Sequence, residues 1–169
     1  MSLSMHQVSV PVFVRALTNL KAILAKGAAH AAAKKIDESA FMQARLAPDM
    51  FPLPQQVQIA TDMARGGAAR LAGSEPPKFD DNETSFAELI ARVERTIAFV
   101  QALPAAQFDG AATRQITRPV RGQPKVFTGV NYLQQFILPN LYFHMTATYL
   151  LLRHNGVDVG KADFIGALD

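Results

Sequence analysis

Two polar residues stand four positions apart in the most apolar part of the chain. Asn140 and His144 lie in the stretch LPNLYFHMTATYLLL, in which most other residues are apolar or aromatic. Residues four apart share one face of a helix, so both side chains should point into the same apolar surface. An unperturbed imidazole titrates near pH 6.5, which suits His144 to act as a general acid or base.

A buried amide and imidazole need partners, because an unsatisfied buried polar group costs roughly 1–3 kcal/mol. Gln56 is the best candidate, since it lies in the apolar arc of a helix predicted to begin at Pro54. His6, near the start of the first predicted helix, is a further candidate for the same pocket. We therefore predict His144 as the catalytic residue and Asn140, Gln56 and His6 as substrate-binding residues.

The same residues could instead bind a metal ion. Its ligands would be His144, Asn140 and Asp62, with zinc or nickel as the ion. The helical phase of Asp62 lies about 160° from the apolar stripe of its helix, which predicts an exposed side chain. Neutral amide oxygens are also poor ligands for the metals that imidazole favours. We therefore expect no cofactor, while a structural hydrogen-bonded cluster, a small-molecule pocket and a metal site all remain open.

The remaining histidines and a basic group near residue 120 have simpler explanations. His30 lies among alanines and is expected in solvent, and His154 suits a helix C-terminus, where a cation is favoured by the helix dipole. A predicted hairpin carries a basic group that could bind an anion, although solvent exposure explains it more simply. Its members are Arg114, Arg118, Arg121 and Lys125. The chain has no phosphate-binding loop, dinucleotide fingerprint, nucleophile elbow or His-Glu-x-x-His motif.

Four long segments must position these residues, and in each of them apolar residues return every three or four positions. They span residues 5–33, 54–73, 85–103 and 129–154. Pro139 interrupts the last segment and should kink it before His144. Residues 115–128 predict a short hairpin. We expect an all-α four-helix bundle that forms a single domain over residues 1–169, with a small β-hairpin before the fourth helix.

Composition narrows the class of protein further. The 169 residues are 49% hydrophobic and 18% charged, which indicates a folded domain. There is no cysteine, so disulfides and thiol nucleophiles are excluded, and a reducing compartment fits. The N-terminal stretch lacks the order of a signal peptide, and polar residues break up the long uncharged run before residue 152. We expect a cytoplasmic protein that binds neither membranes nor nucleic acid.

Three stretches carry a family resemblance. They are SVPVFVRALTNLKAILAKGAAHA, RLAPDMFPLPQQVQIATD and FTGVNYLQQFILPNLYFHMTATYLLLRHNGVDVGKADFIG. They resemble a bacterial family of domains of unknown function within the DinB/YfiT-like metalloenzyme superfamily. The resemblance implies a four-helix bundle of the DinB type, often dimeric. Members of the superfamily typically bind a divalent metal through one histidine on the second helix and a His-x-x-x-His pair on the fourth, and some use it for thiol-dependent transfer.

By this resemblance, His144 matches the second histidine of the pair and Asn140 stands at the first. No histidine lies between His30 and His144, so the second helix supplies none. We therefore expect a bundle with a degenerate metal site that binds a small molecule near His144. The alternatives are a metal-dependent hydrolase or thiol-dependent transferase using His144, and a structural dimeric bundle without catalysis. Whether the protein is an enzyme is left open.

The fourth helix is apolar almost all round, which suggests a second contact surface. Its side opposite Asn140 and His144 carries Tyr142, Met145, Tyr149 and Leu152. In a bundle, one side of each helix is normally exposed to water, so this excess predicts a homodimer unless the C-terminal tail covers it.

Overall fold

The long helices account for most of the chain. The computed structural model describes residues 3–168. Its long helices are α1 (Met5–Lys34), α3 (Leu53–Leu71), α4 (Phe86–Gln101) and a continuous stretch made of α5 (Gly129–Asn131), the π-helical η2 (Tyr132–Ile137) and α6 (Leu138–His154). Short elements are α2 (Glu38–Met42), η1 (Ala105–Phe108) and α7 (Lys161–Ile165), and one hairpin joins β1 (Gln115–Val120) to β2 (Gln123–Thr128). The predicted helical bundle with a single small hairpin is confirmed.

Side-chain caps mark the start of α1, α2 and α4. Ser4 and Gln7 form a capping box at α1, in which the Ser4 hydroxyl accepts from the Gln7 N–H at 3.2 Å and Gln7 accepts from the Ser4 N–H at 2.9 Å. The Asp37 side chain caps α2 by accepting from the Ser39 N–H at 2.9 Å. Ser85 accepts from the first turn of α4 at 3.2 Å. These contacts satisfy amide groups that have no partner inside the helix.

The disturbance predicted at Pro139 takes the form of a π turn. Pro139 lies in the first turn of α6 and lacks the N–H that an α-helix would use. The six residues before α6 adopt the wider π-helical winding. Such π turns are one of the recognised causes of a bend in a long helix. The Asn140 amide donates to the Phe136 carbonyl of this turn at 2.6 Å.

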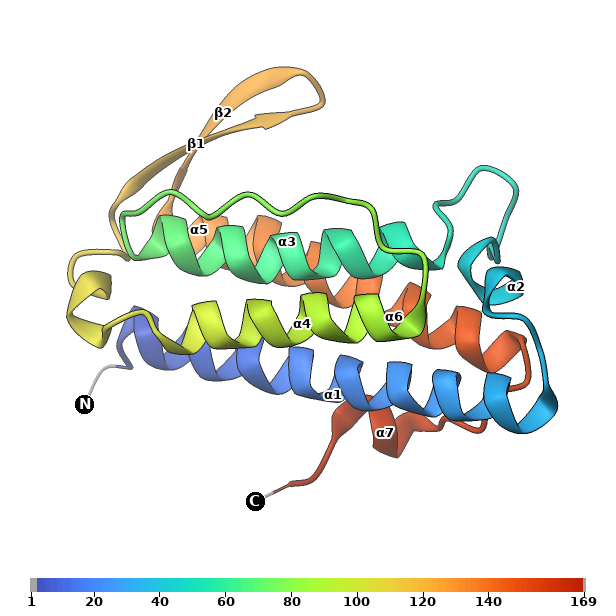
Figure 1. The fold of residues 1–169 in the computed structure, drawn as a ribbon. Helices are drawn as coiled ribbons and strands as arrows, with labels where there is room; N and C mark the ends of the chain where they lie inside the picture. Colours follow the sequence, from blue (N-terminus) through green and yellow to red (C-terminus); the bar gives the residue numbers. More distant parts are fainter. Residues whose placement is uncertain (1–2, 169) are drawn as a thin grey trace.

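The helices are not arranged in a simple up-and-down order. Figure 1 shows α1 and α6 running in one direction and α3 and α4 running in the opposite direction. Because α3 and α4 are parallel, residues 72–85 must return along the length of the bundle, and they do so beside α3. Helix α1 packs against α4, and α3 packs against both α4 and α6.

Small residues on α3 let its neighbours approach closely. Ala60, Ala64 and Ala68 are completely buried. A Cβ atom added to Gly67 would lie 2.9 Å from Ile137 Cγ2, so the backbone of α3 meets the π turn at a distance that only glycine allows.

Of the described helices, α1 is long and apolar enough to cross a bilayer on length and composition alone. In this structure it is instead a core helix of the bundle. Several of its large apolar residues, among them Phe13, Leu17 and Leu24, are completely buried in the core.

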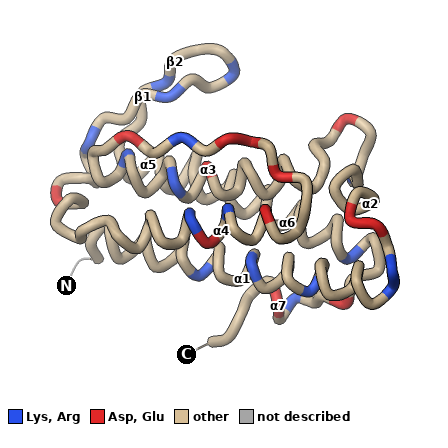
Figure 2. The backbone as a smooth tube through the Cα atoms, in the orientation of Figure 1, with Lys and Arg blue, Asp and Glu red and all other residues tan. Residues whose placement is uncertain are grey.

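Arg92 of α4 carries the largest fully buried side chain among the described residues. Its Nε donates to Thr61 Oγ1 of α3 at 2.8 Å. The two Nη atoms reach the crossover, where the partners are the Asp80 carbonyl at 3.0 Å, Asp81 Oδ1 at 2.9 Å and Glu83 Oε1 at 3.0 Å. A further contact joins Nη2 to Asp62 Oδ1 at 2.9 Å. One guanidinium therefore fastens α3, α4 and the crossover together, and acidic residues gather along that crossover in Figure 2.

Glu83 is the buried carboxylate of this network. Burial by itself would raise its pKa, but hydrogen bonds from Gln58 and Arg92 outweigh burial and lower the pKa below the ordinary value of 4.5. A carboxyl whose pKa is lowered by folding contributes stability above its ordinary pKa and loses it as the pH falls through the lowered value. The network is therefore at full strength at neutral pH.

The structure corrects the prediction for Asp62. Its side chain is 37% exposed, and it accepts from Arg65 at 2.6 Å as well as from Arg92. The crossover covers the side of α3 that would face water in a simple bundle, so a residue outside the apolar stripe becomes half-buried. Gln58 and Arg65, at helical spacing from Asp62, are 6% and 7% exposed for the same reason.

We expect Arg92→Met to lower the free energy of unfolding by about 3–5 kcal/mol, because it leaves Glu83 buried without its cation. Urea unfolding at pH 7 measures the change. Arg95→Met is the matched control, since Arg95 is 59% exposed and lies 3.9 Å from the same carboxylate. Such exposed pairs contribute about 1 kcal/mol or less. Equal losses for the two variants would contradict the assigned role of Arg92.

Candidate functional site

His144 and Gln56 meet in the interior of the bundle. Gln56 lies in the first turn of α3 and His144 in the middle of α6, and they are 1% and 8% exposed. His144 Nδ1 lies 2.7 Å from Gln56 Oε1. The hydrogen-bond partner predicted for His144 is thus confirmed, while the roles predicted for the two residues stay predictions.

The hydrogen-bond pattern determines the tautomer of His144. Gln56 donates from Nε2 to the Phe51 carbonyl at 3.0 Å, so its oxygen faces the imidazole. A carbonyl oxygen only accepts, hence Nδ1 of His144 carries the proton and donates it to Gln56. Burial lowers the pKa of His144 below its ordinary value of 6.5, so the ring is neutral at physiological pH. Its lone pair is therefore on Nε2.

This arrangement leaves the Nε2 atom of His144 able to accept a hydrogen bond or a proton. No hydrogen bond to Nε2 is found among residues 3–168. Orienting one ring nitrogen through a fixed acceptor is also how proteins prepare an imidazole to use the other nitrogen. The Phe143 ring packs edge to face against the imidazole, with centroids 5.1 Å apart. His144 can accept a hydrogen bond or a proton through Nε2 beside an aromatic surface.

Two predicted site residues do not join this pair. Asn140 is half-buried and spends its amide on the Phe136 carbonyl of its own helix. His6 is half-buried in the first turn of α1, where its ring packs against Phe108 with centroids 5.1 Å apart. Figure 1 places the start of α1 and the start of α3, which carries Gln56, at opposite ends of the bundle.

The donor set does not fit the metal site that the family resemblance implies. Within the part of the chain that the structure describes, no three His, Cys, Asp or Glu side chains are grouped to hold a metal ion. Asp62 is engaged by Arg65 and Arg92, which removes the carboxylate from the predicted ligand set. His144 and a neutral amide remain, whereas a catalytic zinc site uses three protein ligands.

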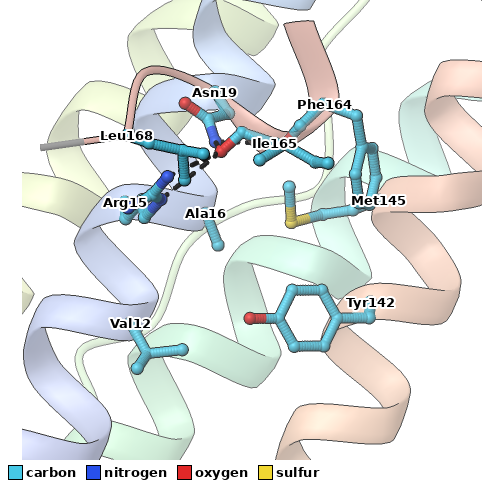
Figure 3. Close-up of a pocket in the computed structure, with 9 residues that line it drawn as sticks. All are labelled: Val12, Arg15, Ala16, Asn19, Tyr142, Met145, Phe164, Ile165 and Leu168. Atoms are coloured by element: carbon cyan, nitrogen blue, oxygen red, sulfur yellow. Dashed lines mark hydrogen bonds between the residues drawn. The ribbon is translucent and has the colours of Figure 1, made fainter. Parts of the chain in front are cut away.

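A cavity lies on another side of the bundle, between α1, α6 and the C-terminal segment (Figure 3). Its volume is about 350 Å³. Arg15 and Asn19 line it, but they donate to backbone carbonyls of the C-terminal segment, including that of Ile165. Tyr142 and Met145 complete a largely apolar wall. The polar groups here hold the C-terminal segment in place, and His144 is not part of the lining.

The fold is a helical bundle in which α3 and α4 run parallel and a hairpin precedes the last long helix, and it matches that of a DinB family member. A crystal structure of a DinB family member protein from Shewanella denitrificans, at 1.83 Å resolution, is 44% identical to this chain. The match covers 97% of this chain and 93% of that one, with a TM-score of 0.91. Residues 5–165 match the family described as a domain of unknown function (DUF1993), and the chain belongs to this family. No curated protein matches the sequence.

We expect nitrogen NMR of the His144 ring to show the Nδ1–H tautomer at neutral pH and a titration midpoint below 6.5. Gln56→Leu removes the acceptor that favours the imidazolium as well as this tautomer, so it should lower the midpoint further and mix the tautomers. Asn140→Ala is the matched control and should leave both properties unchanged, since Asn140 bonds elsewhere. A midpoint above 6.5 in the native protein would contradict the neutral ring.

Proposed function

We propose that this protein binds a small molecule at His144 and that the neutral imidazole accepts a hydrogen bond from the ligand through Nε2. The observation that carries the proposal is the chain of contacts from the Phe51 carbonyl through Gln56 to His144 Nδ1. It orients the ring and sets its tautomer without a metal ion. A structural pair would make the same contact to Nδ1, and the feature that favours a ligand is that Nε2 has no hydrogen-bond partner among residues 3–168.

The environment of His144 favours a neutral ligand group. Burial disfavours charge on the imidazole, so a hydroxyl or amide N–H of the ligand is a better partner than a second charge. The edge-to-face contact with Phe143 places an apolar ring beside that partner. A metal-dependent hydrolase or transferase receives no support, because Asp62 and Asn140 are committed to other partners.

The proposal is tested by screening neutral hydroxyl- and amide-bearing fragments while the His144 ring nitrogens are observed by NMR. Binding fragments should shift the Nε2 resonance more than Nδ1, and His144→Phe should abolish their binding. His30→Phe is the control, since it makes the same substitution at a histidine that packs against Phe41 near the C-terminal end of α1. If every fragment that binds does so equally well to His144→Phe, the proposal fails and the pair is structural.

A second candidate function is self-association, and the exposed surface of α6 favours it. The side predicted from sequence is largely covered, because Met145 and Leu152 are buried and Tyr149 packs against Phe164 of α7. A different row remains exposed, in which Phe143 is 58% and Leu150 43% exposed. These residues are seven apart and share one face of the helix. A second copy seated on this row would also cover the Phe143 ring beside His144.

We expect sedimentation at tens of micromolar to show a dimer that Leu150→Glu converts to a monomer, because a charge would then be buried at the interface. Leu168→Glu is the control, since Leu168 is 81% exposed on the C-terminal segment and outside this row. A native protein that sediments as a monomer would remove the dimer proposal and leave the His144 proposal intact.

A further inference from the structure

We propose that a second cavity, enclosed by α3, β1 and η2, binds the oxyanion group of a small molecule, a phosphate or a carboxylate. The cavity has a volume of about 150 Å³. Three arginines and one tyrosine supply its hydrogen-bond donors, and Asp62 is its one acidic residue: the donors are Arg65 and Arg70 from α3, Arg118 from β1 and Tyr132 from η2. None of its lining residues belongs to the Gln56–His144 pair, so this proposal stands apart from the function proposed above.

Buried donors without partners are the main evidence. Arg65 is 7% exposed, and its Nη2 donates to Asp62 at 2.6 Å. Among the described residues, its Nε and Nη1 are buried and have no hydrogen-bond partner, and the same holds for Nε of Arg118. A buried charged donor without an acceptor is costly, and native proteins rarely leave one so. An oxyanion in the cavity would supply the missing acceptors.

The charges around the cavity are not balanced by the protein. Asp62 is the one carboxylate of the lining, and Arg92 shares it. Burial lowers the pKa of Arg65, while the charge of Asp62 opposes that effect. The Phe79 ring lies 4.0 Å from the Arg65 guanidinium carbon, which holds the group in place without accepting a strong hydrogen bond. The lining therefore carries an excess of positive charge.

Tyr132 adds a donor suited to an anion. Its side chain is 1% exposed. Burial raises the pKa of the Tyr132 hydroxyl, and the nearby charges of Arg70 and Arg118 act in the opposite direction. The hydroxyl therefore keeps its proton at neutral pH and can donate it. Arg70 donates from Nη1 to the Gly66 carbonyl at 3.1 Å. Guanidinium and phenol donors that line one small cavity match the oxygens of a phosphate or carboxylate.

The surroundings leave room for the rest of such a ligand. Arg70 also lines an adjacent cavity of about 270 Å³, together with Ser74 and Thr117. Arg114 also lines this adjacent cavity. Its guanidinium, however, donates to the carbonyl of Leu71, the last residue of α3, and so caps the C-terminus of that helix. Of the basic hairpin residues singled out in the sequence, Arg118 thus faces the proposed site, whereas Arg121 and Lys125 are exposed.

The test is a titration of the full-length protein with inorganic phosphate and, separately, with acetate, at constant ionic strength and pH 7.5, followed by amide NMR. We expect saturable shifts around the cavity with at least one anion. Binding of phosphate alone indicates a phosphorylated ligand, and binding of acetate alone a carboxylate. Arg118→Gln should weaken binding roughly tenfold or more, because it removes a charged hydrogen bond.

Lys125→Gln is the matched control. Lys125 lies opposite Arg118 in the register of the hairpin and does not line the cavity. The substitution Lys125→Gln therefore removes one positive charge from nearly the same place without changing the lining. It should change the affinity by less than about twofold, the effect of a screened surface charge. Gln56→Leu should leave anion binding unchanged. Absence of saturable binding, shifts located away from the cavity, or equal weakening by Arg118→Gln and Lys125→Gln would each overturn the proposal.

Discussion

The buried guanidinium of Arg92 holds together the feature that sets this bundle apart, its parallel pair of central helices. Parallel neighbours require a long return of the chain, and the returning segment has little apolar surface of its own. Arg92 binds a backbone carbonyl and two carboxylates of that segment, and it also binds Thr61 and Asp62 of α3. Removing such charges from water is costly. The network therefore favours the one arrangement of α3, α4 and the crossover in which every charged group has a partner.

Helix α3 becomes the central element as a consequence. It is covered by α4, by α6 and by the crossover, so residues on most of its circumference are buried. The small residues of α3 let α6 and the π turn before it pack closely, and Gln56 at the start of α3 reaches His144 of α6. The later turns of α3 carry Arg65 and Arg70 to the second cavity. Both proposed sites thus depend on the same close packing around one helix.

Much of the fold and part of the site follow from local patterns in the sequence. The hairpin lies at residues 115–128 as predicted, and its turn residues Arg121 and Gly122 both have positive φ, as a two-residue hairpin turn requires. The helical phase of Gln56 by itself predicts that its side chain lies in the core. The helical phase of Arg92 also indicates the interior, since it follows the apolar Leu89 by three positions.

By itself, the sequence determined the helices, their caps, the hairpin and the apolar faces, because these depend on residues within a few positions of one another. Only the tertiary structure decided what covers the polar faces. Asp62 is half-buried because a segment about twenty residues further along lies over it. Asn140 bonds to its own π turn and not to His144, because the irregular backbone offers a nearer acceptor. Helical periodicity encodes which face is apolar, but it carries no information on which distant segment will cover the opposite face.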